Sequence, residues 1–195
     1  MNLQARFRQI DEYINERWLG IFTAEWHQVR DPEKPDFRGY GPTSYRDWRI
    51  IRRHITPKGS FIDYGAGLGR VTALAARFPF NRVIGIDLDP DLVKRGNQNL
   101  EGARGLKCDA RIVCEDATTF QIPHDASVLY FCNPFSGKVL EAVLKKVRNR
   151  YLSLVCNLPP VSGFEHEIRQ IPWLALQTEF ALSDHRKCLI FRPAM

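Results

Sequence analysis

The chain has 195 residues, 44% of them hydrophobic, and a formal net charge of +6. This length fills one hydrophobic core and leaves little room for a second, so we expect a single domain over residues 1–195. The opening residues 1–18 contain no apolar run typical of a secretory signal or a membrane span, which predicts a soluble, cytoplasmic protein with no membrane partner. The positive charge favours a nucleic acid or another acidic partner.

Residues 1–40 are expected to form a helical extension followed by a loop. Five apolar residues step by three or four positions, as on the packed stripe of an amphipathic helix: Leu3, Phe7, Ile10, Ile14 and Trp18. Residues 31–44 hold three prolines and two glycines, which predicts an irregular connection. Ordered loops of this length are often functional.

Residues 45–54, "YRDWRIIRRH", are the most basic stretch of the chain. Tyr45, Trp48, Ile51 and Ile55 fall at helical spacing, which predicts a helix with these residues inward. Four arginines then lie on its other faces: Arg46, Arg49, Arg52 and Arg53. A solvated helix face is the simplest interpretation, and attraction of a phosphate-bearing partner is the alternative.

From residue 60 onward, short apolar runs alternate with helical periodicity, which is typical of a parallel sheet wrapped by helices. Strands are expected at residues 60–64, 82–87, 111–114, 127–132, 151–157, 173–182 and 187–191. No helix separates the last two strands, so they should form an antiparallel hairpin. The predicted fold class is α/β: a doubly wound, seven-stranded, mostly parallel sheet in a Rossmann-like core of residues 41–195.

The stretch "FIDYGAGLGR", residues 61–70, places a glycine turn after the first strand. A dinucleotide fingerprint reads G-x-G-x-x-G, but here Gly65, Gly67 and Gly69 form G-x-G-x-G, so the third glycine arrives one residue early. Asp63 adds a carboxylate at the strand end where a pyrophosphate would sit. The pattern therefore favours a ligand that is cationic at this point.

Two further acids follow the next two strands. Asp87 ends the second strand about 20 residues beyond the glycine turn, where a carboxylate is expected to bind ribose hydroxyls, and Leu88 beside it joins the predicted cofactor site. Asp116 would accept from an adenine amino group, and the N–H of Ala117 would reach a ring nitrogen. Each acid alone is consistent with a helix cap, but the ordered set predicts a nucleoside site.

The run "FIDYGAGLGR…VIGIDLDP…CEDA" resembles the cofactor-binding part of the class I S-adenosylmethionine-dependent methyltransferases, including small bacterial enzymes of unassigned substrate. The resemblance covers roughly residues 40–192 and implies S-adenosyl-L-methionine as the cofactor. By position it implies three glycines beneath the cofactor and three acids on its ammonium, ribose and adenine groups: Gly65, Gly67 and Gly69, and Asp63, Asp87 and Asp116.

The loop "YGPTSYRDW" resembles the Tyr-Gly-x-Thr-Ser loop of the non-SET histone lysine methyltransferases, which closes over the methionine end of the cofactor. By this resemblance Tyr40 and Thr43 contact the cofactor. Pro42 stands where that family usually has an acidic residue, so a histone substrate does not follow.

The fourth strand ends in "YFCNPFSG", beside the expected position of the cofactor's sulfonium. Asn133 is placed to orient a nucleophile and to contact the cofactor. Pro134 follows it in the predicted site, and Phe135 is expected to form an apolar wall against the reacting group. The stretch resembles the [DN]-P-P-[YF] motif of methyltransferases that act on adenine or glutamine amide nitrogen, but Phe135 and Ser136 depart from it. A nitrogen acceptor is favoured, a plain Asn-Pro turn is the alternative, and lysine, amide, nucleobase and small amine remain open as acceptors.

The sequence does not complete the zinc-binding motif that it begins. His166 and Glu167 begin an H-E-x-x-H zinc motif, but Gln170 ends it, so no metal is expected. Two alternative functions remain: a non-catalytic nucleotide-binding sensor or scaffold, and a nicotinamide oxidoreductase, which the early third glycine and Asp63 disfavour.

Overall fold

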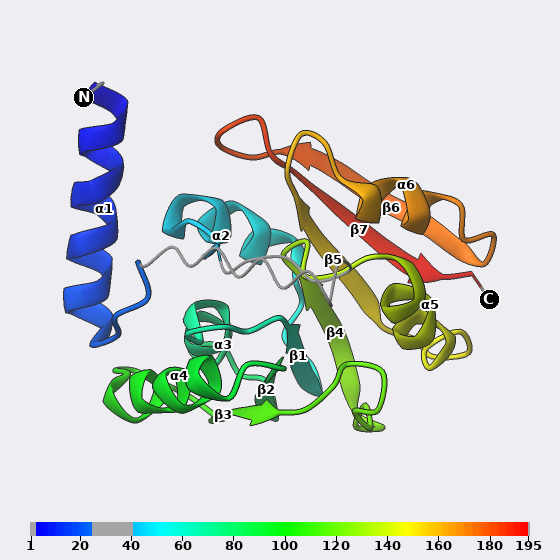
Figure 1. Ribbon diagram of the computed structural model, residues 1–195, viewed down its shortest axis with the longest axis horizontal. Coiled ribbons are helices and arrows are strands. Elements are labelled where there is room, and N and C mark those ends of the chain that lie inside the picture. Colours follow the sequence, from blue (N-terminus) through cyan, green and yellow to red (C-terminus); the bar gives the residue numbers. More distant parts are fainter. Residues whose placement is uncertain (1–2, 25–40, 195) are drawn as a thin grey trace.

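The structure, a computed structural model, describes residues 3–24 and 41–194, with the side chains of residues 3–8 left aside. A seven-stranded sheet forms its centre (Figure 1). Its strands are β1 (Ser60–Tyr64), β2 (Arg82–Asp87), β3 (Asp109–Cys114), β4 (Ala126–Phe131), β5 (Ser153–Leu158), β6 (Leu174–Ala181) and β7 (Lys187–Pro193).

The strand order is β3-β2-β1-β4-β5-β7-β6. The first five strands pair in parallel, whereas β7 runs antiparallel to both β5 and β6. The predicted mostly parallel sheet with a C-terminal antiparallel hairpin is therefore confirmed.

Helices cover both faces of the sheet (Figure 1). They are α1 (Leu3–Leu19), α2 (Tyr45–Ile51) with the 3-10 turn η1 (Arg52–His54), α3 (Arg70–Ala75), α4 (Pro90–Gly102), α5 (Gly137–Lys145) and α6 (Gly163–Arg169). Successive strand residues point to opposite faces. Phe61 packs in the core under α2, α3 and α4, whereas Ile62 packs in the core under α5 and α6.

Helix α6 was not predicted from the sequence. It has seven residues and buries only Phe164 and Ile168, so it carries too little apolar periodicity to be recognised. Ser162 caps its N-terminus by accepting a hydrogen bond from the Glu165 N–H at 3.4 Å.

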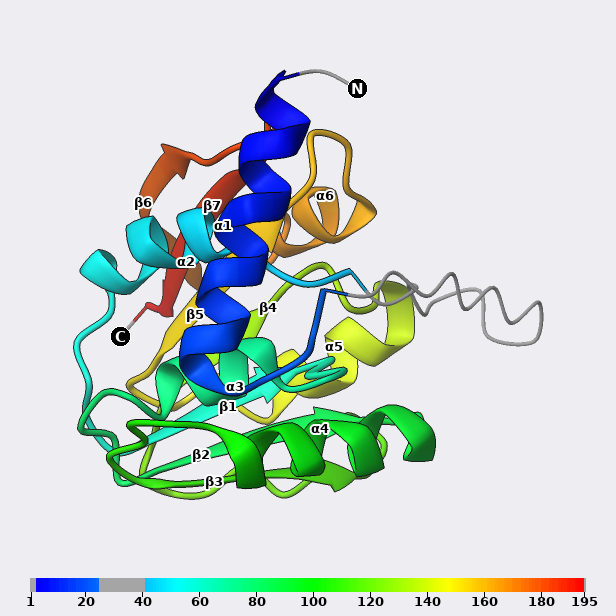
Figure 2. The same cartoon turned by 90° about the vertical axis from the view of Figure 1, so that its left-hand side faces the viewer.

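The predicted N-terminal helix is present, but its orientation differs from the expectation. Ile10, Ile14 and Trp18 are 54%, 59% and 62% exposed, so this part of the apolar stripe faces away from the core. The inward side carries Glu16 and Leu19 instead, and Figure 2 shows α1 crossing in front of α2. Periodicity identifies the apolar face of a helix but not whether that face points toward the core. In α1 the buried ion pairs of its acidic residues determine which face points inward.

Helix α2 follows its prediction except at its end, because Ile55 lies in extended backbone after η1. Tyr45, Trp48 and Ile51 are buried, and all four predicted arginines of α2 and η1 are exposed. Among the described residues, no helix is both long enough and apolar enough to cross a bilayer.

Candidate functional site

The predicted site residues gather at one edge of the sheet. Because β1 to β4 are parallel, their carboxyl ends lie side by side in the order β3, β2, β1, β4. The pairs Asp87↔Cys114 and Tyr64↔Phe131 mark the ends of these ladders. Asp116, Asp87, the glycine turn and Asn133 therefore follow one another along the edge, and the chain order reverses between β1 and β4, where open α/β sheets bind ligands.

The glycine turn adopts a backbone that other residues rarely take. Gly65, Gly67 and Gly69 have φ angles of 73°, 53° and 83°. The N–H groups of Gly65 and Ala66 donate to the carbonyl oxygen of Ile86 at 2.9 and 3.0 Å, which ties the start of the turn to the end of β2. The turn is thus shaped by its glycines and fixed by the neighbouring strand.

Close packing holds this turn from two sides. A Cβ on Gly65 would lie 2.7 Å from Pro134 Cβ, so the turn after β1 touches the turn after β4. A Cβ on Gly96 of α4 would lie 2.8 Å from the Gly67 carbonyl oxygen and 2.5 Å from Ile112 Cδ1. Gly96 is therefore required for the close approach of α4 to the glycine turn. The low helix propensity of glycine gives no indication of this packing role.

Asp63 is a buried carboxylate with few partners. It is 2% exposed, and its Oδ2 accepts from the Thr72 hydroxyl at 2.8 Å. Burial raises the pKa of Asp63 to about 7, the Thr72 hydrogen bond opposes this, and the charge of Asp87 adds to it. No cation contacts this carboxylate among the described residues, so it suits a cationic ligand group.

Asp87 is fastened by backbone donors. Its Oδ2 accepts from the Gly67 N–H at 2.7 Å and its Oδ1 from the Asp89 N–H at 3.1 Å. Burial raises the pKa of Asp87, and these two hydrogen bonds act against that rise. Each oxygen keeps a second lone pair, which is the arrangement that adjacent ribose hydroxyls need.

The end of β3 offers one acceptor and one donor. Asp116 Oδ1 accepts from both the N–H and the hydroxyl of Thr118 at 2.7 Å, whereas Oδ2 has no hydrogen-bond partner among the described residues. The N–H of Ala117 likewise donates to no residue in the described part of the chain. Leu88 is half-buried at the adjacent end of β2. This set fits the amino group, ring nitrogen and face of an adenine.

Asn133 lies at the end of β4 in a left-handed conformation, with φ of 51°. Its Oδ1 accepts from the Ser162 hydroxyl at 2.7 Å, which links it to the cap of α6. The side chain is half-buried, so it is held in place yet reachable.

The expectation that Phe135 forms a wall toward the substrate is not matched by its position. Phe135 is only 3% exposed, and its ring packs edge-on against Tyr64 at 5.9 Å and Phe131 at 6.0 Å. After the Asn133–Pro134 turn, the chain directs residue 135 into the core covered by α5. The ring supports the turn from below.

Of the two predicted loop residues, Tyr40 lies outside the described residues. Thr43 is 4% exposed, and its hydroxyl lies 2.8 Å from the Tyr130 hydroxyl. Asn157 Nδ2 donates to both oxygens, at 3.2 Å and 3.1 Å. The side chain of Thr43 is therefore anchored to β4 and β5.

Arg70, which closes the "FIDYGAGLGR" motif, has a structural importance that sequence reasoning missed. It is 2% exposed and forms ion pairs with Glu12 at 2.6 Å and Glu16 at 3.1 Å of α1. It also donates to the Thr23 hydroxyl at 2.6 Å and the Thr43 carbonyl oxygen at 3.1 Å. Its partners are dispersed over the first 43 residues, so no local pattern could reveal them.

Asn99 of α4 provides a second link to the N-terminal segment. Its Nδ2 donates to the carbonyl oxygens of Leu68 at 2.9 Å and Phe22 at 3.1 Å, and its Oδ1 accepts from the Phe22 N–H at 2.9 Å. Leu68 lies between two glycines of the turn. Asn99 therefore links the segment after α1 to the glycine turn.

The incomplete zinc motif has a structural role instead. Glu167 Oε2 accepts from the Gly137 N–H at 2.6 Å, at the N-terminus of α5, and His166 is exposed. Within residues 3–24 and 41–194, no group of three His, Cys, Asp or Glu side chains is placed to hold a metal ion.

Comparison with known proteins agrees with this geometry. A family described as a methyltransferase domain matches residues 61–151. This part of the chain is thus similar in sequence to a methyltransferase domain. Ribosomal protein L11 methyltransferase from Burkholderia cenocepacia is 33% identical over 111 residues, which cover 52% of this chain and 35% of that protein. The chain thus spans about a third of the length of the curated relatives it matches.

Solved structures share the fold at low identity. A TehB-like SAM-dependent methyltransferase from Corynebacterium glutamicum has a TM-score of 0.57 at 19% identity, covering 78% of this chain and 90% of that one. An RNA methyltransferase from Salinibacter ruber, in complex with S-adenosyl-L-homocysteine, has a TM-score of 0.58 at 19% identity, covering 79% and 94%.

Proposed function

We propose that the protein is an S-adenosylmethionine-dependent methyltransferase that acts on a nitrogen acceptor. One observation carries the proposal: three carboxylates end three adjacent strands around the glycine turn, and the one on β1, Asp63, is buried with a hydroxyl partner and no cation among the described residues. A nicotinamide dinucleotide would bring its pyrophosphate close to that carboxylate, which is unfavourable.

The residues present fit the proposed cofactor. Asp63 in its ionised form would bind the methionine ammonium, Asp87 the ribose hydroxyls, and Asp116 with Ala117 the edge of the adenine, while Leu88 would contact its face. The glycine turn would pass beneath, and Tyr40 with Thr43 would lie on the methionine side. S-adenosylmethionine supplies a methyl group already activated on a sulfonium sulfur, so the protein has mainly to align the acceptor.

Asn133 would perform that alignment. Its amide oxygen, held by Ser162, accepts an N–H of the acceptor and so directs the nitrogen lone pair toward the methyl group. Pro134 packs on Gly65, which keeps the acceptor turn in register with the cofactor turn. Phe135 supports this turn from the core.

The names of the similar proteins, which refer to a ribosomal protein and to RNA, favour a macromolecular acceptor here as well. The four exposed arginines of α2 and η1 support a nucleic acid or another acidic partner.

Calorimetric titration with S-adenosylmethionine tests the cofactor assignment. We expect binding by the wild type, loss of binding in Asp87→Ala, and wild-type affinity in Asp91→Asn, which removes a nearby exposed carboxylate. Binding of NADH with no binding of S-adenosylmethionine would refute the proposal.

Asn133→Ala separates an enzyme from a non-catalytic sensor. We expect this variant to keep the affinity for S-adenosylmethionine and to lose transfer of a radiolabelled methyl group to the macromolecules of a cell lysate. A wild type that binds the cofactor but labels nothing would favour the sensor, and full labelling by the variant would remove Asn133 from the mechanism.

A further inference from the structure

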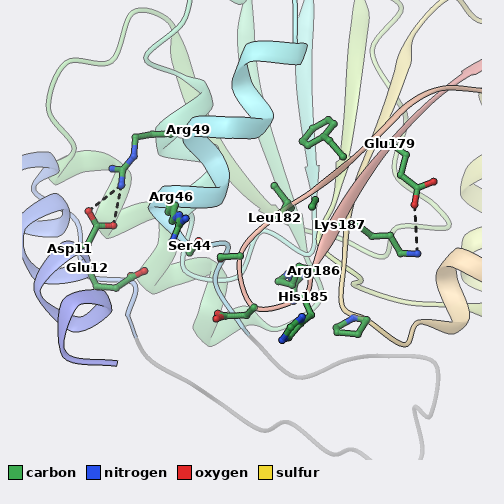
Figure 3. A pocket seen from close by; sticks show the side chains of 15 residues that line it. Asp11, Glu12, Ser44, Arg46, Arg49, Glu179, Leu182, His185, Arg186 and Lys187 are labelled. Atoms are coloured by element: carbon green, nitrogen blue, oxygen red, sulfur yellow. Dashed lines mark hydrogen bonds and ion pairs between the residues drawn. The ribbon is translucent and has the colours of Figure 1, made fainter. Parts of the chain in front are cut away.

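A large hollow of about 1190 Å³ lies between α1, the start of α2 and the β6–β7 turn (Figure 3). It borders the candidate acceptor turn through Arg186, which lines the hollow and donates from Nη2 to Cys132 Sγ at 3.5 Å. Cys132 directly precedes Asn133. Arg186 therefore connects this hollow to the residue that directly precedes Asn133.

Several charges that line the hollow are already neutralised by partners. Arg49 pairs with Asp11 at 3.1 Å. Lys187 pairs with Glu165 at 2.8 Å and with Glu179 at 3.7 Å. These pairs, some of them shown in Figure 3, leave little net charge of their own. Two further carboxylates line the hollow: Glu12, which pairs with Arg70 at 2.6 Å, and Asp184.

Arg186 differs because its partners are neutral. Its Nε donates to Asn157 Oδ1 at 2.9 Å, and its Nη2 donates to the Asn157 carbonyl oxygen at 3.2 Å as well as to Cys132. Burial raises the pKa of the Cys132 thiol, although the Arg186 charge opposes this, so the sulfur supplies no full negative charge. Arg186 is half-buried and forms no ion pair with any described residue, an unusual state for a guanidinium.

A second cation faces the same hollow. Arg46 of α2 lines it, is exposed, and likewise has no ion-pair partner in the described part of the chain. Arg46 comes from α2, whereas Arg186 comes from the turn that precedes β7 (Figure 3).

The turn that carries Arg186 is constrained. Asp184 and His185 have φ angles of 53° and 58°, a left-handed conformation that non-glycine residues rarely adopt. The Ser183 N–H donates to Asp47 Oδ1 of α2 at 2.8 Å, and the Leu182 N–H donates to the Arg186 carbonyl oxygen at 2.8 Å. Such backbone strain concentrates at ligand sites, where the surrounding structure maintains it.

We propose that this hollow binds an anionic group of the methyl acceptor, a carboxylate or a phosphate, with Arg186 as the principal contact and Arg46 as the second. Arg186 keeps Nη1 free of hydrogen bonds to the described residues, and a guanidinium recognises both groups through charge-assisted hydrogen bonds. Only the identification of the ligand as the acceptor rests on the proposed function; the anion site itself rests on the hollow.

Calorimetric titration of the full chain with inorganic phosphate and with succinate, at constant ionic strength, tests the site. We expect the preferred anion to bind the wild type roughly tenfold or more tightly than it binds Arg186→Met, because the variant loses the charge-assisted hydrogen bonds to the anion. Arg46→Met should weaken binding less, and Arg53→Met, which removes an exposed charge outside the hollow, should leave it unchanged. The tighter anion identifies the group as phosphate or carboxylate.

Equal affinities of the wild type and Arg186→Met, or no binding of either anion by the wild type, would overturn the proposal. Because Arg186→Met also leaves Asn157 Oδ1 without its donor, Arg186→Lys and Arg46→Met provide variants that disturb the fold less. Titration of the same proteins with S-adenosylmethionine separates the two proposals, since we expect cofactor affinity to persist in all of them. A wild type that binds the anion but not the cofactor would refute the methyltransferase function and leave the anion site standing.

Discussion

Asp63 opposes folding when its carboxyl group is ionised. Its pKa is about 7 in the folded protein and 3.8 in its unperturbed state, so the folded chain retains this proton over a range in which the unfolded chain has lost it. The contribution of Asp63 to stability therefore falls as pH rises from about 4 to about 7, and it stays low above that. The ammonium group of a bound ligand would offset this loss of stability by pairing with the ionised Asp63 carboxylate.

Asp63→Asn should consequently be more stable than the wild type at pH 8. Asparagine can still accept from Thr72, and it never ionises, so the advantage should reach a few kcal/mol at about 1.4 kcal/mol per pKa unit and shrink toward pH 5. The same change should weaken binding of S-adenosylmethionine by roughly ten- to a hundredfold. Urea unfolding at both pH values and calorimetry measure the two effects, and a variant no more stable than the wild type at pH 8 would contradict this account.

At the scale of elements, helix α1 is attached to the core through charge. Arg70 holds Glu12 and Glu16 at a buried contact, whereas Arg49 holds Asp11 at the surface, with side-chain exposures of 48% and 39%. The two contacts involve the same helix and the same chemistry but differ in access to water.

Arg70→Met should destabilise the fold by about 3–5 kcal/mol, because it leaves buried carboxylates without their cation. Arg49→Met should change the unfolding free energy by less than about 1 kcal/mol, since exposed pairs contribute little. Urea denaturation of both variants measures the difference. Similar losses for the two would mean that burial does not determine the strength of the attachment.

Gly96 of α4 tests the packing of the glycine turn. Glycine to alanine usually stabilises a helix by up to about 1 kcal/mol, but the added Cβ in Gly96→Ala would press on the Gly67 carbonyl oxygen and on Ile112. We expect lower thermal stability and weaker cofactor binding. Gly163→Ala in α6 is the matched control, because nothing lies within 4 Å of its added Cβ, and it should be neutral or slightly stabilising. A Gly96→Ala protein that behaves like this control would show that the turn adapts.

At the scale of the whole molecule, the strands and the order of the acids could be predicted because both follow from local pattern. An apolar run identifies a buried strand, and parallel strands bring their carboxyl ends to one edge. The direction of α1, the burial of Phe135 and the partners of Arg70 and Arg186 could not be predicted. Each depends on contacts between segments distant in sequence, such as Arg186 and Asn157, which are 29 positions apart.

The net charge of +6 leads to a prediction about polyanions. The exposed arginines of α2 and η1 should bind single-stranded RNA with an affinity that falls as salt rises, by a log–log slope of about 0.7 for each phosphate contact. Arg52→Gln with Arg53→Gln should reduce this slope, because η1 presents both side chains to solvent. Lys138→Gln with Arg148→Gln removes the same charge from exposed positions on and just beyond α5, and it should leave the slope nearly unchanged. Filter binding across a salt series measures both pairs. Equal effects would assign the attraction to overall charge, and no binding at low salt would remove RNA as a partner of this face.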